Sequence, residues 1–113
     1  MNYSYSYFSE ASISITRELG VPPMTASLFV RHNVNDYGAW RKFYDDADTI
    51  RQAHGCTAES VFRLPSDTND VLVIHEFATV QQAEAFASDP ALKSAMQQGG
   101  VTSPPRVEIF ESA

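Results

Sequence analysis

Two periods in the placement of apolar residues predict the secondary structure of this chain. Four short runs rich in branched and aromatic side chains are typical of strands: residues 27–32, 56–64, 71–78 and 105–111. Between them, apolar side chains recur every three or four positions, which is typical of helices that bury one face: residues 36–53 and 80–98. The polar run from Pro65 to Asp70 predicts a turn between the two middle strands. The predicted order of elements is therefore βαββαβ.

Capping signals locate the ends of the predicted helices. We expect Asn35 or Asp36 to cap the first helix, because a short side-chain acceptor takes a backbone N–H that has no helical partner. Gly55 follows the expected end of this helix at residue 53 and supplies the left-handed conformation that stops it. The pair Asp89-Pro90 predicts that the second helical segment stops and restarts at this point.

The order of elements predicts an α+β, ferredoxin-like fold. Two right-handed crossovers produce a four-stranded antiparallel sheet with both helical segments on one face. Alternation along the strands places one apolar set on one face: Leu28, Val30, Val71, Val73 and Phe77. A second apolar set lies on the opposite face: Phe29, Leu72 and Ile74. Because the helices cover only one of these faces, the other predicts a partner, most simply a second copy of the chain.

Length and charge restrict the class of protein. The 113 residues suit one domain, which we place at residues 24–113 after an N-terminal extension of residues 1–23. This extension either adds nothing to the core or forms an arm that pairs with a sheet edge. The net charge of -6 repels phosphate backbones and anionic membrane surfaces, and no apolar run reaches the ~18 residues of a membrane span. We therefore expect no nucleic-acid partner and no membrane partner.

Cysteine and acidic residues give no sign of a metal site. Cys56 is the only cysteine, so the chain has neither an internal disulfide nor a thiolate cluster, and a cytoplasmic location is the default expectation. Asp45, Asp46 and Asp48 form an acidic run without a histidine at ligand spacing, which favours a solvated helix face. We predict no metal and no other cofactor.

Two histidines are the candidate catalytic residues. His32 and His75 share one face of the first and third strands, which are neighbours in this topology. If this face lines a pocket, the two imidazoles meet in apolar surroundings, where burial lowers their pKa values and keeps them neutral, ready to act as a base. The alternative is structural: each histidine only caps a strand end or satisfies a carbonyl group at an interface.

The predicted substrate-binding residues flank these histidines: Arg31, Asn33, Glu76 and Phe77. Arg31 and Glu76 lie together on the opposite face of the same two strands. They form either a cross-strand ion pair or a site in which Arg31 anchors a carboxylate or enolate and Glu76 orients it. Arg31 or Asn33 would stabilise developing oxyanion charge. For Phe77 the alternative is that its large side chain, together with that of Phe110, fills the space and leaves no pocket.

Several of these residues occur in a pattern that resembles a known superfamily. The pattern consists of His32-x-Val34-x-Asp36-Tyr37-x-x-Trp40, Gly55, Glu76-Phe77, the segment from Ala83 to Leu92, and Gly100-Val101. Over residues 26–111 the chain resembles the dimeric α/β-barrel superfamily, in its antibiotic-biosynthesis-monooxygenase-like, uncharacterised branch. The resemblance implies two ferredoxin-like sheets packed into one barrel, with helices outside and a small-molecule pocket in each half.

The resemblance implies a fold but does not choose a reaction. Members include cofactor-free quinol oxygenases, lactone isomerases and haem-handling enzymes. The haem-degrading members use a Trp well after the first helix, whereas Trp40 lies inside it and is expected in the core, so we do not transfer their chemistry.

The hypothesis is therefore a cytoplasmic homodimer that binds a small apolar, aromatic or polyketide-like molecule. As an enzyme it would be a cofactor-independent monooxygenase, or an isomerase or cyclase, with His32 or His75 as the base. The competing hypotheses are a ligand-binding or stress-response module without turnover, and a second apolar face that only forms the dimer and leaves no pocket.

Overall fold

The computed structural model describes residues 24–113, and the predicted N-terminal extension, residues 1–23, lies outside the described residues. The elements follow the predicted order, with each helical segment divided in two: β1 (Ala26–Asn33), α2 (Tyr37–Asp46), α3 (Asp48–Ala53), β2 (Ala58–Leu64), β3 (Asp67–Phe77), α4 (Val80–Ala87), α5 (Pro90–Gln98) and β4 (Arg106–Glu111). The strands form one antiparallel sheet in the order β2-β3-β1-β4. This order confirms the predicted ferredoxin-like fold and the central place of the third strand.

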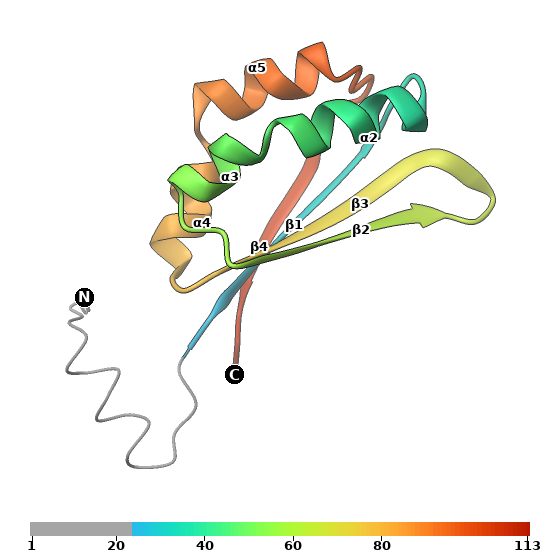
Figure 1. Cartoon of the computed structure of the whole chain (residues 1–113). Coiled ribbons are helices and arrows are strands. Elements are labelled where there is room, and N and C mark those ends of the chain that lie inside the picture. The colour runs from blue at the N-terminus through green and yellow to red at the C-terminus, as the bar shows by residue number, and fades with distance from the viewer. Residues whose placement is uncertain (1–23) are drawn as a thin grey trace.

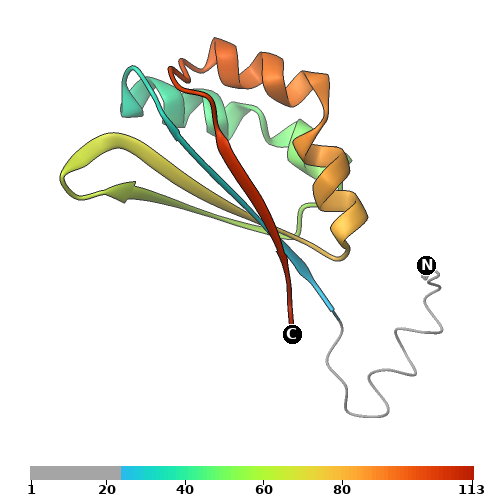
Figure 2. The ribbon, with the colours of Figure 1, turned by 180° about the vertical axis from the view of Figure 1, so that it is seen from behind.

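The helices form a layer on one face of the sheet and leave the other face open (Figure 1). The same two layers appear from behind, with β4 alongside β1 (Figure 2). Helix α4 packs on β1, β3 and β4 and joins the two layers at one end. Within residues 24–113, no helix has the length and apolar character needed to cross a membrane.

The helix ends largely follow the capping signals. The Asp36 side chain caps α2 by accepting a hydrogen bond from the backbone N–H of Ala39 at 2.9 Å. The expectation of one unbroken helix to residue 53 is wrong, because α2 ends at Asp46 and α3 begins at Asp48. Between them the backbone N–H of Ala47 is shared by two carbonyls, those of Phe43 and Tyr44. Neither glycine nor proline marks this break in the sequence.

The predicted turn over residues 65–70 is shorter than expected. Asp67 already belongs to β3, so the turn itself consists of Pro65 and Ser66. The polar residues after it become a strand because β1 offers them backbone partners. Asp70 lies opposite Asn33, and the backbone N–H of Val34 donates to the carbonyl of Asn69 at 2.9 Å. Long-range pairing therefore overrides the local turn propensity.

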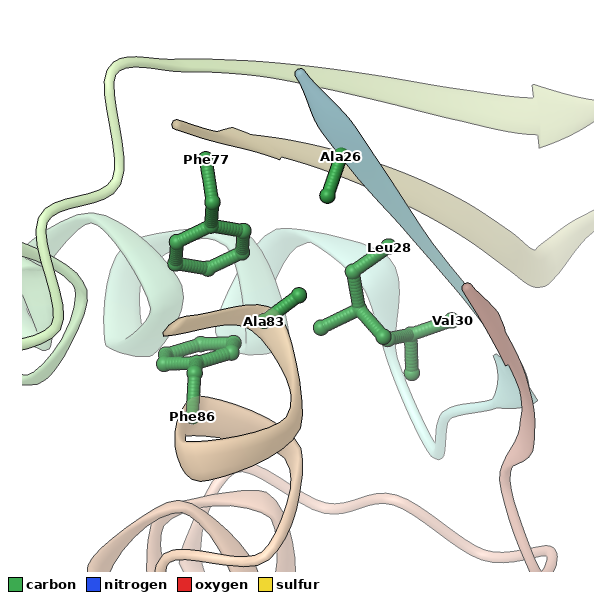
Figure 3. Close-up of a cluster of buried hydrophobic side chains, with 6 residues drawn as sticks. All are labelled: Ala26, Leu28, Val30, Phe77, Ala83 and Phe86. Atoms are coloured by element: carbon green, nitrogen blue, oxygen red, sulfur yellow. The ribbon is translucent and has the colours of Figure 1, made fainter. Parts of the chain in front are cut away.

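Two groups of buried apolar side chains fix the helices on the sheet. In the first, Ala83 and Phe86 of α4 face Leu28 and Phe77 of the central strands (Figure 3). The rings of Phe77 and Phe86 lie 5.5 Å apart, and both side chains are buried. The second group anchors α2 at the other end of the same strands: Val34, Trp40, Val71 and Val73. Trp40 is therefore a core residue, as predicted.

Candidate functional site

The strand register keeps the two candidate histidines apart. His32 pairs with Val71 and His75 pairs with Leu28, so the histidines are four positions apart along adjacent strands. At about 3.3 Å per residue this offset is roughly 13 Å. Both side chains are buried on the helix-covered face that they were predicted to share. The expectation that their imidazoles meet is wrong.

Helix α2 fills the space between the histidines with aromatic rings. Trp40 and Tyr44, about one helical turn apart, stack with ring centroids 4.9 Å from each other. The ring of His32 lies 5.8 Å from that of Trp40, and the ring of His75 lies 6.0 Å from that of Tyr44. A row of aromatic side chains thus runs from one histidine to the other, and each histidine has its own surroundings.

Tyr44 and His75 form a hydrogen-bonded pair. The hydroxyl oxygen of Tyr44 lies 3.0 Å from Nε2 of His75. The other ring nitrogen of His75, Nδ1, is buried and has no hydrogen-bond partner among the described residues, and the same is true of Nδ1 of His32. Because a buried nitrogen without a partner lowers stability, it indicates a position that a bound molecule can complete.

A cavity of about 50 Å³ lies beside the Tyr44–His75 pair. Both residues belong to its wall, together with Trp40, Arg51 and Phe86. The rest of the wall is apolar: Phe43, Ala47, Ile50, Leu92, Ala95 and Met96. Within residues 24–113, no group of three or more His, Cys, Asp or Glu side chains is arranged to hold a metal ion. The cavity combines an apolar lining with one polar end, as small-molecule sites do.

Burial determines the protonation states at this polar end. It lowers the pKa of His75 to about 4, with a smaller contribution from the positive charge of Arg51. Burial also raises the pKa of Tyr44 above its ordinary value. At neutral pH both partners are therefore uncharged, and each can donate or accept the shared hydrogen bond. Burial lowers the pKa of His32 as well.

Arg51 is a buried cation in the wall of the cavity. Its Nε lies 2.9 Å from a carboxylate oxygen of Glu59 on β2 and 3.2 Å from one of Asp48 on α3. Its guanidinium carbon lies 4.0 Å from the centre of the Tyr44 ring. These contacts supply the negative charges that a buried guanidinium group requires and hold one face of the Tyr44 ring by a cation–π interaction.

Arg31 and Glu76 lie on the open face of the sheet, away from this cavity. The register separates them by four positions, so the expectation that they lie together is wrong. Arg31 pairs instead with Asp70, with 2.8 Å between Nη2 and a carboxylate oxygen. Glu76 accepts a hydrogen bond from the hydroxyl of Ser27 at 2.6 Å. Each side chain therefore has a structural partner across the β1–β3 ladder.

Asn33 and Phe77, the other two predicted substrate-binding residues, also lie outside the cavity wall. Asn33 is at the end of β1, where its backbone N–H donates to the hydroxyl of Ser103 at 2.9 Å. Phe77 is fully buried in the core beside Phe86. Phe77 therefore fills core space between the sheet and α4, and the cavity beside His75 remains.

Sequence reasoning missed Tyr44 and Arg51 as members of a site. Their spacing carried a signal: Tyr44 follows Trp40 by four positions and Arg51 follows Tyr44 by seven, which would put the three on one face of the unbroken helix that the pattern predicts. An arginine on an apolar helical face implies a buried charge, and a buried charge implies an opposite charge nearby. The partner Glu59 comes from another element, so the sequence could not identify it.

Burial of His75 makes the stability of this protein depend on pH. The unfolded chain protonates His75 near pH 6.5, whereas the folded chain resists protonation until about pH 4. Between these values the unfolded state binds more protons, so the free energy of unfolding falls as the pH is lowered, by on the order of 3 kcal/mol. Denaturant titrations of the wild type and His75→Phe between pH 6.5 and 4 measure this change. The variant is expected to lose the His75 part of the slope and keep the His32 part; equal slopes would contradict the burial of an uncharged imidazole.

Comparison with known proteins identifies relatives by fold. The sequence matches no family model, and none of the curated proteins is significantly similar to it. Among solved structures, the NE2512 protein of unknown function from Nitrosomonas europaea is 24% identical, with a TM-score of 0.60, and the match covers 80% of this chain and 90% of that chain.

Two further solved structures carry a description of activity. A protein proposed to be an antibiotic biosynthesis monooxygenase, from Caulobacter crescentus, is 14% identical, with a TM-score of 0.62 over 79% of this chain and 90% of that chain. SnoaB, a cofactor-independent oxygenase from Streptomyces nogalater, is 10% identical, with a TM-score of 0.58 over 79% of this chain and 91% of that chain. Identities this low show the fold alone: this chain has the ferredoxin-like α+β fold of the antibiotic-biosynthesis-monooxygenase-like proteins.

Proposed function

We propose that this protein binds a small, mostly apolar molecule in the cavity beside His75 and Tyr44. The observation that carries the proposal is the unpartnered Nδ1 of His75, a buried polar atom in a side chain that lines an apolar cavity. A ligand with a hydroxyl or carbonyl group would supply the missing hydrogen bond, while its apolar part would cover the rest of the wall.

The size of the cavity limits the ligand. Its volume of about 50 Å³ is roughly a third of the ~150 Å³ of a cavity that binds benzene, and pockets for drug-sized ligands measure about 300–1,000 Å³. The ligand that we propose therefore has no more than one ring, such as a phenol or a hydroquinone, and α5 has to move outward to admit it. Leu92, Ala95 and the flexible Met96 of this helix form part of the wall. A polyketide-like molecule would require a much larger movement of α5.

Cofactor-independent oxygenation of a hydroquinone is the reaction that we propose for this cavity. His75 would accept a phenolic proton, and the electron-rich ring would react with O₂ to form a bond between a ring carbon and one oxygen atom. The O–O bond then breaks and the other oxygen atom leaves as water. Hydroquinone itself is the reductant: it supplies the electrons and two hydrogens and ends as a hydroxybenzoquinone (C₆H₆O₂ + O₂ → C₆H₄O₃ + H₂O). Because the pKa of His75 is about 4, its imidazolium does not persist alone at neutral pH. It forms only while the negatively charged phenolate lies beside it, since that charge raises the pKa of His75. The positive charge of Arg51 would stabilise the same phenolate. The fold similarity to SnoaB supports this reaction class.

A binding module without turnover is the second candidate function. The low pKa of His75 favours the binding module, because a His75 imidazole with a pKa of about 4 is a weak base and holds a phenolic proton poorly. Both candidates use the same cavity and the same hydrogen bond. They differ in whether the bound molecule consumes oxygen.

We further propose that the open face of the sheet binds a second copy of this chain in the cytoplasm. Phe29 and Phe110 pack edge to face there, with ring centroids 5.3 Å apart, and Phe110 is 59% exposed. Phe62 lies opposite Leu72, on the same face, and is 51% exposed. Exposed aromatic clusters of this kind are typical of protein interfaces, and a second copy would cover them by symmetry.

Filling the cavity is expected to prevent ligand binding. Ala95→Phe adds a ring inside the wall, whereas Ala91→Phe adds the same ring to the exposed surface of α5 and serves as the matched control. Phenol and hydroquinone are titrated into each protein and followed by NMR. Saturable binding is expected for the wild type and Ala91→Phe, and a large loss of affinity for Ala95→Phe. Unchanged affinity in Ala95→Phe would place the site elsewhere.

Oxygen uptake with hydroquinone, measured on the same proteins, separates the two candidate functions. An oxygenase is expected to lose about 10²–10⁴-fold of its rate in His75→Ala, because a positioned base contributes that much. His32→Ala is the matched control, since His32 is equally buried but lies outside the cavity wall. A wild type that binds hydroquinone and consumes no oxygen would contradict the oxygenase and leave the binding module.

Replacing Phe62 and Phe110 together by glutamate is expected to convert a dimer into monomers of 12.5 kDa, because charged side chains cannot be buried across the interface without partners. Multi-angle light scattering measures the mass. Ala91→Glu, on the exposed surface of α5, is the control and is expected to stay dimeric. A monomeric wild type would refute the second copy as the occupant of the open face.

A further inference from the structure

Arg51 makes contacts beyond those that pair its charge. Its guanidinium group joins three elements: α3, from which it comes, β2 through Glu59, and α2 through the ring of Tyr44. The side chain is 5% exposed, so these contacts replace water around the charge. Arg41 lies 5.7 Å from the same ring, but its side chain is 40% exposed and pairs with Asp45. Of these two arginines, only Arg51 belongs to the cavity wall.

We propose that Arg51 is a positioning residue for the cavity: by stacking on Tyr44 and pairing with Glu59, it holds the Tyr44 hydroxyl on Nε2 of His75. The inference rests on the proposed function only in treating the cavity as a ligand site. With Nε2 occupied by Tyr44, Nδ1 is the ring nitrogen left for a bound molecule. Without this stacking, no cation restrains that face of the Tyr44 ring, so the Tyr44–His75 pair at the polar end of the cavity is less ordered when a ligand binds.

The position of Glu59 explains why its charge must be paired. Glu59 lies directly opposite His75 in the β2–β3 ladder, and Cβ atoms of opposite residues are about 4.5–5.5 Å apart. An unpaired carboxylate at that distance would favour a positively charged imidazole. The other titratable or charged side chains near the pair are Asp48 on α3, Arg41 on α2 and Cys56. By binding the Glu59 carboxylate at 2.9 Å, Arg51 compensates that negative charge and adds to burial, the larger cause, in keeping His75 uncharged.

Arg51→Met tests the inference, because methionine fills similar space without a charge or a planar group. The pKa of His75 is measured by NMR titration of its ring protons in the full chain, without ligand. We expect it to rise by about 1–3 units in Arg51→Met and to stay unchanged in Arg41→Met, the matched control. A purely structural Arg51 would lower stability and leave the pKa of His75 where it is, and that result would overturn the inference.

Further variants separate the two parts of the inference and replace Arg51→Met if that protein does not fold. Glu59→Gln leaves Arg51 paired with Asp48 but without its Glu59 partner, and is expected to lower the pKa of His75 further. Arg51→Lys keeps the charge but not the planar stack, so we expect a nearly unchanged pKa of His75 and phenol affinity weaker by about tenfold. An unchanged pKa of His75 in Glu59→Gln would overturn the role of the Arg51–Glu59 pair. Full phenol affinity in Arg51→Lys would overturn the role of the stacking of Arg51 on Tyr44.

The design also distinguishes failure of this inference from failure of the proposed function. If the wild type binds neither phenol nor hydroquinone, the proposed function fails. The ligand-free titration of His75 still decides whether Arg51 sets the state of the Tyr44–His75 pair.

Discussion

Burial of His75 between the sheet and the helices is the constraint on which the site depends. An imidazole in this position loses its water, so it must be uncharged and needs partners from the protein or from a ligand. Tyr44 supplies one of these partners, and Arg51 in turn restrains Tyr44 and neutralises Glu59. The polar end of the cavity is thus assembled from α2, α3, β2 and β3, and no single element provides it.

The two faces of the sheet carry different groups of side chains. The helix-covered face holds the cavity and both buried histidines, whereas the open face carries Phe29, Phe62 and Phe110. A second copy on the open face would leave the cavity within each protomer, between its own sheet and helices. Binding of a ligand and formation of a dimer can therefore be changed independently.

The fold could be predicted from the sequence because local signals agree with each other. Apolar residues recur with a period of two in the strands and near four in the helices, and Asp36 and Asp89 cap the helices as predicted. These signals, with the alternation along β1 and β3, agree with the observed sheet order. The break at Ala47 could not be predicted, because no glycine or proline causes it. The candidate site was predicted less well. Alternation gave the face on which His32 and His75 lie, but the register that separates them comes from pairing between distant segments.

Nδ1 of His75 is the atom that we propose a ligand in the cavity engages. Nitrogen-15 NMR of the histidine rings, on the full chain with and without phenol, tests this proposal most directly, because ring nitrogen shifts report hydrogen bonding and protonation. Saturating phenol is expected to shift Nδ1 of His75. The ring nitrogens of His32, and of His54, whose Nε2 lies 2.7 Å from a carboxylate oxygen of Asp89, are expected to keep their positions. Phenol binding that shifts His32, or that leaves Nδ1 of His75 unchanged, would contradict it.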